Sequence, residues 1–270
     1  MIKVNDLHFS YSGRKMLFDR LSMQLGTGSI TGLLGKNGAG KTSLLKLIAG
    51  SLHPRSGEIS VLNHIPGKRE VSLLGNIFFV TEDFRVPHVI IDDYMKAFSP
   101  FYKDFDHGLM YNLLKEFGLE TDNNLQLLSH GQKKKFLIAF ALASRCRLLI
   151  FDEPTNGLDI PSKSLFRKIL AGSLDEAQLV IISTHQVKDV ENLIDKIIIL
   201  DNGKVIFHET IADISKKVCF TSGTSNDIER AIYSEAVPGG YRLVLPKDNT
   251  ETEVDIELLF NAVTNGKQIA

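Results

Sequence analysis

The sequence predicts an α/β fold in which helices cover a mainly parallel β-sheet. Two apolar runs, residues 148–151 and 179–183, lack the alternation of half-exposed strands, which is typical of parallel strands covered on both faces. Residues 1–28 instead contain short strand-like segments separated by glycine turns, and these predict antiparallel strands ahead of the sheet. Helix signals at about residues 86–140 predict an inserted helical subdomain.

The composition is ordinary for a globular chain of 270 residues, with 43% hydrophobic and 23% charged residues. The net charge of -1 gives no reason to expect nucleic acid as a partner. Cys146 and Cys219 make no metal-ligand cluster, and we expect both to be reduced thiols. The first residues do not resemble a signal peptide, and no apolar run approaches the ~20 residues of a membrane helix. We therefore expect a cytoplasmic protein that reaches a membrane only through a partner.

The pattern of apolar residues and turns predicts the strands in order. The N-terminal strands are expected at residues 2–9, 15–18 and 21–25, with turns at 12–13 and 26–28. The remaining strands are expected at residues 29–34, 57–62, 75–80, 148–151 and 179–183. A hairpin is expected to join residues 197–200 to 205–207 through Asp201-Asn202-Gly203.

The helical region is rich in aromatic side chains. Gly118 and Asn123-Asn124 interrupt residues 86–128, so we expect several helices there rather than one. A strongly apolar helix is expected at residues 136–143. Two roles are open for the aromatic side chains, which either pack in the core or line a groove on the surface.

Residues 35–42 match the pattern G-x-x-x-x-G-K-[ST] between a strand-like run and an apolar helix. The glycines allow a turn tight enough for consecutive N–H groups to face phosphate oxygens, and the helix N-terminus adds partial positive charge. Lys41 adds a full positive charge, and the Thr42 hydroxyl is an expected Mg²⁺ ligand. The predicted nucleotide-binding residues are Gly35, Lys36, Asn37, Gly38, Ala39, Gly40, Lys41, Thr42 and Ser43. The alternative is a glycine-rich turn without a ligand, but the flanking strand and helix favour a P-loop NTPase core.

Carboxylate and histidine side chains, which can bind metal ions or transfer protons, follow several of the predicted strands. Glu82, Asp152, Glu153 and His185 each come after an apolar strand-like run. Ligands in an open α/β sheet bind beyond the carboxyl ends of the strands, so we expect these side chains to meet beside the phosphate loop. Asp152 is the expected Mg²⁺ ligand. Glu153 is the expected general base for an attacking water. The alternative is a solvated carboxylate in a turn, but Pro154 fixes the turn directly after Glu153, which favours the catalytic role.

Three further segments carry a family resemblance. They are Leu128-Ser129-His130-Gly131-Gln132, residues 150–159 and Ser183-Thr184-His185. Together with the phosphate loop, these segments make residues 1–210 similar to the nucleotide-binding subunit of an ABC (ATP-binding cassette) transporter. We refer to residues 128–132 as the signature segment, after its counterpart in that family.

The resemblance implies a role for each matching residue. Tyr11 stands where the family stacks an aromatic ring on adenine, with Phe9 as the alternative. Glu82 takes the place of a glutamine that contacts Mg²⁺ and senses the γ-phosphate, which also makes it a candidate metal ligand. Asp159 would contact a second subunit, and His185 would act on the γ-phosphate as a catalytic residue. The signature residues implied to bind the partner's nucleotide are Ser129, His130, Gly131 and Gln132.

The resemblance further implies ATP and Mg²⁺ as cofactors. It implies two partners, an integral-membrane permease and either a second copy of this chain or a homologous ATPase subunit. Such a subunit is cytoplasmic and peripheral on the inner face of the cell membrane. Glu82 in place of glutamine is similar to subunits paired with separately encoded exporter-type permeases, which favours export. The alternatives are a soluble ABC ATPase without a permease, for example in cofactor assembly, and a nucleotide-dependent regulatory module.

Two regions lie outside these motifs. Lys133-Lys134-Lys135 is interpreted as the solvated face of a helix over about residues 132–144, with a phosphate clamp as the alternative. Residues 211–270 follow the ATPase domain of residues 1–210 and predict a small α+β extension. Its strands are expected at 217–220 and 241–245, and its helices at 226–233 and 254–263. Dimer contact, regulation and packing onto the core are its possible roles.

Overall fold

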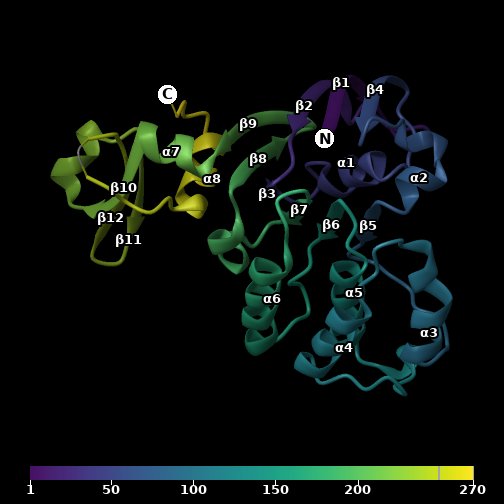
Figure 1. Ribbon diagram of the computed structural model, residues 1–270. Coiled ribbons are helices and arrows are strands. Elements are labelled where there is room, and N and C mark those ends of the chain that lie inside the picture. The colour runs from purple at the N-terminus through teal and green to yellow at the C-terminus, as the bar shows by residue number, and fades with distance from the viewer. Residues whose placement is uncertain (249, 270) are drawn as a thin grey trace.

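The structure is a computed structural model that describes residues 1–248 and 250–269. Within these residues the strands form one six-stranded sheet and two three-stranded sheets (Figure 1). The large sheet has the order β5-β6-β7-β3-β8-β9. Its strands are β3 (Ser29–Leu34), β5 (Ile77–Val80), β6 (Leu148–Asp152), β7 (Leu179–Thr184), β8 (Lys196–Asp201) and β9 (Lys204–Thr210). The neighbours β5, β6, β7, β3 and β8 pair in parallel in that order, and β9 pairs antiparallel with β8, which confirms the predicted fold class.

The apolar runs of the parallel strands supply both faces of the large sheet. In β6, Leu149 and Phe151 belong to one hydrophobic core, whereas Leu148 and Ile150 belong to another. The first core joins the sheet to the helices of the middle of the chain and to the C-terminal residues. The second joins the sheet to helix α1 (Lys41–Ile48) and to the N-terminal strands. Burial on both faces explains why these strands lack alternation.

The N-terminal sheet is antiparallel, with the order β2-β1-β4. Its strands are β1 (Ile2–Phe9), β2 (Phe18–Leu25) and β4 (Ser56–Val61). The prediction of separate strands at residues 15–18 and 21–25 is wrong, because β2 is one continuous strand and residues 15–17 form the loop before it. Phe18 pairs with Phe9 of β1, so pairing begins only where the loop ends.

Short helices fill the region between β4 and β6, which confirms the prediction of several helices. They are α2 (Val71–Leu74), α3 (Ile91–Phe98), α4 (His107–Glu116) and α5 (His130–Ala143), with the 3₁₀ turns η1 (Pro66–Lys68), η2 (Ser99–Phe101) and η3 (Leu125–Leu127). The ring of Phe140 on α5 lies 4.9 Å from that of Phe105 and 5.3 Å from that of Tyr94. Many of the aromatic side chains therefore form core, whereas Phe101 is 70% exposed.

The C-terminal extension forms the third sheet, with the order β10-β12-β11. Its elements are α7 (Ile211–Lys217), β10 (Val218–Gly223), η6 (Ser225–Arg230), β11 (Tyr233–Val237), β12 (Gly240–Pro246) and α8 (Ile256–Thr264). The prediction of a helix at residues 226–233 is wrong, because these residues span most of a 3₁₀ turn and the start of strand β11. Thr224 and Asp227 cap only a 3₁₀ turn, and Tyr233 then begins a strand that pairs with β12.

Helix α8 carries the extension back to the main domain, beside β9 (Figure 1). Buried Leu259 of α8 shares a hydrophobic core with Val187 and Val190. These two residues lie in and after η4 (Val187–Asp189), which follows β7 and precedes η5 (Glu191–Leu193). Before β7, helix α6 (Ile160–Ser173) connects it to β6. Within the described residues, every helix is too short or too polar to span a membrane.

Candidate functional site

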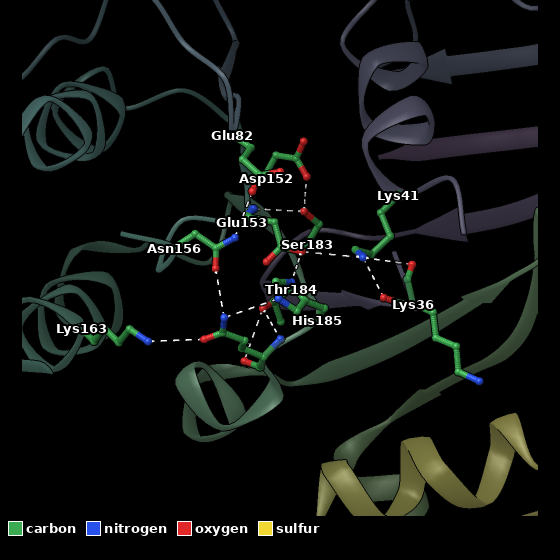
Figure 2. A network of polar contacts seen from close by, with 12 residues as sticks. Lys36, Lys41, Glu82, Asp152, Glu153, Asn156, Lys163, Ser183, Thr184 and His185 are labelled. Carbon is green, nitrogen blue, oxygen red and sulfur yellow. Dashed lines mark hydrogen bonds and ion pairs between the residues drawn. The ribbon is translucent and has the colours of Figure 1, made fainter. Parts of the chain in front are cut away.

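Four neighbouring parallel strands deliver the predicted site residues to one edge of the sheet. Strand β3 leads into the phosphate loop, β5 into Glu82, β6 into Asp152 and Glu153, and β7 into His185. Because β5, β6, β7 and β3 are adjacent in that order, their carboxyl ends lie together (Figure 2). This arrangement confirms the expectation drawn from the strand ends.

The phosphate loop needs its glycines for backbone geometry and for space. Gly38 and Gly40 have φ of 82° and 108°, in the region where a side chain would be strained. A Cβ at Gly35 would lie 2.6 Å from the Leu200 carbonyl oxygen. A Cβ at Gly40 would lie 2.8 Å from the Phe18 ring. The loop is therefore packed against β2 and β8 and cannot change its path easily.

Lys41 is buried at the start of α1, with its ammonium group turned back under the loop. It donates to the Gly35 carbonyl oxygen at 2.7 Å and to the Lys36 carbonyl oxygen at 3.5 Å. Its Nζ also lies 3.7 Å from Glu153 Oε1. The Lys36 side chain, by contrast, points away from this network (Figure 2). One fixed cation therefore lies between the loop and the Glu153 carboxylate.

A cavity of about 590 Å³ opens in front of the phosphate loop. Its size is within the range of small-ligand sites. The residues that line it are Tyr11, Arg14, Lys15, Met16, Leu17, Lys36, Asn37, Gly38, Gly40, Lys41, Thr42, Ser43, Glu82 and Glu153. Four of these side chains are cationic and two are carboxylates. The lining therefore favours a polyanion.

Tyr11 lies at one side of this cavity. Its hydroxyl lies 2.9 Å from Ser43 Oγ, and its ring packs edge-on against Phe9. The guanidinium of Arg14 lies 5.8 Å from the ring centroid. Tyr11 is half-buried and borders the cavity, whereas Phe9 is buried behind it. Of the two predicted aromatic residues, Tyr11 is therefore the one with a ring available to a ligand.

Asp152 and Glu153 are buried but incompletely paired. Ser183 Oγ donates to Asp152 Oδ1, and His185 Nδ1 lies 2.9 Å from Glu153 Oε1. Among the described residues, Asp152 Oδ2 and Glu153 Oε2 have no hydrogen-bond partner. A buried unpaired carboxylate oxygen is costly unless a cation or a water binds it. With the Thr42 hydroxyl on the cavity wall, this donor set fits Mg²⁺ at Asp152 and a water at Glu153.

Glu153 has a strained backbone, with a φ of 49° that non-glycine residues seldom adopt. Its N–H donates to the Ser183 carbonyl oxygen at 3.0 Å. Its carbonyl oxygen accepts from Lys134 Nζ at 3.0 Å. Contacts from β7 and α5 therefore hold the turn that carries the carboxylate. Such strain persists where the surrounding structure fixes it and is common at active sites.

Glu82 contacts Asn156, a residue of the segment 150–159 for which the sequence predicts no role. Asn156 Nδ2 donates to Glu82 Oε1 at 3.0 Å, so Glu82 acts as the acceptor that its chemistry requires (Figure 2). Asn156 Oδ1 accepts in turn from Gln186 Nε2 at 3.4 Å. Asn156 thereby links Gln186, the residue after His185, to Glu82 in the loop after β5 through two hydrogen bonds.

The signature segment lies outside the cavity of its own phosphate loop. Ser129 and Gln132 form a reciprocal capping box, so α5 begins at His130 rather than near Gln132. The ring of His130 stacks on Phe84 at 4.8 Å. Gly131 lies in the first turn of the helix, where a Cβ would approach the Gly157 carbonyl oxygen to 3.0 Å. Ser129 and His130 are exposed.

Asp159 is also exposed and is not among the residues that line the cavity. It caps α6, where the Ser162 N–H donates to its Oδ1 at 3.0 Å. Hydrogen bonds from Ser162 hold the pKa of the Asp159 carboxyl below its usual range. The predicted site residues therefore form two groups, one in and behind the cavity and one on the surface at the starts of α5 and α6.

Lys134 corrects the interpretation of the lysine triplet. Lys133 and Lys135 are half-buried, but Lys134 is 1% exposed and belongs neither to a solvated face nor to the cavity lining. Burial lowers the pKa of its ammonium group, while nearby carboxylates act in the opposite direction. Helical spacing could have identified it, because Leu137 and Ile138, three and four residues further on, are buried too.

These features define a P-loop ATPase, with a glycine-rich phosphate loop, a buried lysine and two incompletely paired carboxylates. The family model described as "ABC transporter" matches residues 18–156, slightly more than half of the chain. The chain belongs to this family and is an ABC transporter ATP-binding subunit with ATPase activity.

Similar proteins agree with this assignment. The chain is 28% identical over 271 residues to the uncharacterized ABC transporter ATP-binding protein MJ1023 of Methanocaldococcus jannaschii, covering 96% of this chain and 95% of that one. It is 32% identical to the SkfA peptide export ATP-binding protein SkfE of Bacillus subtilis, covering 70% of this chain and 80% of that one. A solved structure of an ATP-binding subunit of an ABC transporter aligns with a TM-score of 0.71 at 25% identity, covering 79% and 91% of the two chains.

Proposed function

We propose that this chain is the ATP-hydrolysing subunit of an exporter, and that it works as a dimer on an integral-membrane permease. The observation that carries the proposal is the separation of the signature segment from the cavity. Ser129 and the free N–H groups at the start of α5 make an anion site that is not part of the cavity of their own phosphate loop. A second subunit would supply the missing nucleotide.

In this proposal the nucleotide lies in the cavity in front of the phosphate loop. The Tyr11 ring would stack on adenine, and the loop N–H groups and Lys41 would bind the phosphates. Thr42 and Asp152 would hold Mg²⁺, which when bound supplies positive charge to the phosphate oxygens. Glu82 is close enough to the cavity to contact the same hydrated ion.

Glu153 would take the proton from the attacking water. Its Oε1 is bound by His185, and its Oε2 is the oxygen without a partner, so Oε2 is the acceptor for that proton. His185 would orient the carboxylate in this state and contact the γ-phosphate when the dimer closes. The strained backbone at Glu153 helps to fix the carboxylate before the reaction begins.

The dimer would place the signature segment and Asp159 of each chain against the nucleotide of the other. Both lie on the surface at the N-terminus of a helix, where backbone N–H groups and partial positive charge attract an anion. The partner is a second copy of this chain or a homologous subunit. Two nucleotides would be enclosed between two chains.

The permease would bind the helical subdomain. Exposed aromatic side chains there, Phe98 at 40% and Phe101 at 70%, offer apolar surface to a membrane partner. The chain would then be peripheral on the cytoplasmic face of the membrane. Export rather than import is supported by Glu82 and by the similarity to SkfE, a peptide export ATP-binding protein.

The test is to search the neighbouring genes for an integral-membrane permease and to reconstitute the full chain with it. We expect Mg²⁺-dependent ATP hydrolysis by the chain alone and faster hydrolysis with the permease in vesicles. A chain that hydrolyses ATP but never responds to, or associates with, a permease would contradict the transport role and favour a soluble ABC ATPase. A chain that binds ATP without hydrolysis would favour a regulatory module.

A further inference from the structure

Lys134 is a buried lysine that the proposed mechanism does not use. It lies on α5, five residues after Ser129, and its Nζ reaches across to the turn after β6. There it donates to the carbonyl oxygens of Glu153 at 3.0 Å and of Asn156 at 2.7 Å. A single side chain therefore joins the helix of the signature segment to both ends of the turn that carries the catalytic carboxylate.

Both acceptors are backbone carbonyl groups rather than carboxylates. A primary amine donates to such groups whether or not it is protonated, so the contact does not depend on an ion pair. Its effect is geometric. It fixes the carbonyl of Glu153, the residue with the left-handed backbone, while the Ser183 carbonyl fixes the N–H of the same residue.

The hydrogen bond from Lys134 helps to hold Glu153 in its strained backbone conformation. A non-glycine residue with positive φ relaxes when the contacts that hold it are removed, because the conformation is costly by itself. Relaxation would rotate the Glu153 peptide and move its carboxylate away from His185. We expect the phosphate loop to keep its conformation, since the hydrogen bonds of Lys134 among the described residues go to the turn after β6 and not to the loop.

We propose that Lys134 is a positioning residue that ties α5 to the turn of Glu153, so that engagement of the signature segment by one nucleotide is transmitted to the general base acting on the other. This proposal rests on the dimeric mechanism proposed above. A shift of α5 on binding the partner's nucleotide would move Lys134 Nζ, and with it the carbonyl groups of Glu153 and Asn156. The two nucleotide sites would thereby be coupled through one side chain in each subunit.

The test compares Lys134→Met with Lys134→Gln in the full chain. Methionine keeps the apolar stem and most of the length but has no donor, whereas glutamine, of similar length to methionine, has an amide N–H group. We expect Lys134→Met to lower kcat by about tenfold or more, since small displacements of a catalytic group have effects of this size. ATP affinity should stay within about threefold, and the Hill coefficient for ATP should fall toward one. Lys134→Gln should recover part of kcat.

Lys168→Met is the matched control, because Lys168 is exposed on α6 and the chemical change is the same. Thermal unfolding of each variant is measured beside the kinetics, and assays are run well below the lowest midpoint. Unchanged kcat and Hill coefficient in Lys134→Met would overturn the inference. A loss of ATP affinity and kcat in proportion, without rescue by glutamine, would overturn it too, because a general structural defect would explain it. A wild-type chain without ATP-dependent dimerisation would instead contradict the dimeric mechanism.

Discussion

His185 Nδ1 lies 2.9 Å from Glu153 Oε1, so the histidine after β7 binds one oxygen of the carboxylate after β6. The other oxygen, Oε2, is buried and has no partner among the described residues. The histidine therefore fixes the orientation of the carboxylate without occupying the oxygen that can accept a proton. Lys41 Nζ, 3.7 Å from Oε1, completes a cluster that depends on three different strands.

Glu153→Gln should preserve ATP binding and abolish turnover. Glutamine keeps the shape of the side chain and can still contact His185, but it cannot accept the proton of an attacking water. We expect kcat to fall by at least about 100-fold, the usual lower size of a general-base effect. Steady-state hydrolysis and equilibrium binding of ATP measure the two properties separately. Glu58→Gln, at an exposed carboxylate on β4, is the control, and near-normal hydrolysis by Glu153→Gln would refute the assignment.

Lys41→Ala should weaken ATP binding by about tenfold or more, since one charge-assisted contact exceeds the 1.4 kcal/mol of each tenfold step. Lys41 is buried and its Nζ donates to the Gly35 carbonyl oxygen of the loop, whereas the Lys36 side chain is exposed and points away from this polar network (Figure 2). Lys36→Ala in the same loop should therefore have a much smaller effect. Binding of a fluorescent ATP analogue to both variants is the measurement. Equal losses would show that Lys41 has no special role.

The sequence was sufficient for the parts of the site that depend on local geometry. A glycine-rich turn between a strand and a helix determines its own backbone path, so residues 35–42 could be interpreted without a structure. The strand ends were predictable because parallel strands share one carboxyl edge. Apolar runs without alternation likewise identified β6 and β7 as buried strands.

Contacts between distant elements could not be predicted. Asn156 meets Glu82 only because β5 and β6 are neighbours, and His130 meets Phe84 only because α5 packs beside the loop after β5. Residues 226–233 carry a helical pattern, but pairing of Tyr233 with β12 prevails over it. The burial of Lys134 is a different case: the triplet of like charges indicates a solvated face, but the helical spacing from Lys134 to the buried Leu137 and Ile138 indicates a core position.

The Glu153→Gln chain should be mainly monomeric without nucleotide and should dimerise with ATP in the absence of Mg²⁺. The physical reason is the split site, in which the exposed N-terminus of α5 has no phosphate from its own chain to bind. Multi-angle light scattering measures the mass in both conditions. ADP, which lacks the γ-phosphate, is the control and should leave the monomer. One unchanged mass with and without ATP would count against closure of the dimer on nucleotide.

Leu259→Ala in the C-terminal extension should destabilise the whole chain by about 2–5 kcal/mol, the usual cost of a large cavity in a core. Leu259 is fully buried and packs in the same core as Val187 and Val190, which follow His185 in the chain. Leu127→Ala, the same change at a side chain that is 79% exposed, should cost less than about 0.5 kcal/mol. Chemical denaturation, followed by intrinsic fluorescence and circular dichroism, measures the free energy of unfolding of both variants. A negligible effect of Leu259→Ala would show that residues 211–270 fold independently of the ATPase domain.

Glu82→Ala should reduce coupling to the permease more than it reduces ATP binding. Glu82 is exposed, and its Oε1 accepts from Asn156 Nδ2 at 3.0 Å, while Phe84 two residues later stacks on His130. The loop after β5 therefore contacts the turn after β6, which carries Glu153 and Asn156, and the signature segment, and it leads into the helical subdomain. Alanine at position 82 removes the hydrogen bond between the loop after β5 and Asn156. The contacts of the phosphate loop do not involve that bond and should remain.

We expect ATP affinity to stay within about threefold in Glu82→Ala, a change of less than 1 kcal/mol. Permease-stimulated hydrolysis and transport should fall clearly below those of the wild-type complex. Glu82→Gln should retain part of the coupling, because an amide oxygen can also accept from Asn156. Asp83→Ala, at the adjacent exposed carboxylate, is the control for loss of charge in the loop. ATP affinity and transport are measured on the same reconstituted complexes. Normal coupling in Glu82→Ala would mean that Glu82 does not sense the γ-phosphate and that its contact with Asn156 has no part in transport.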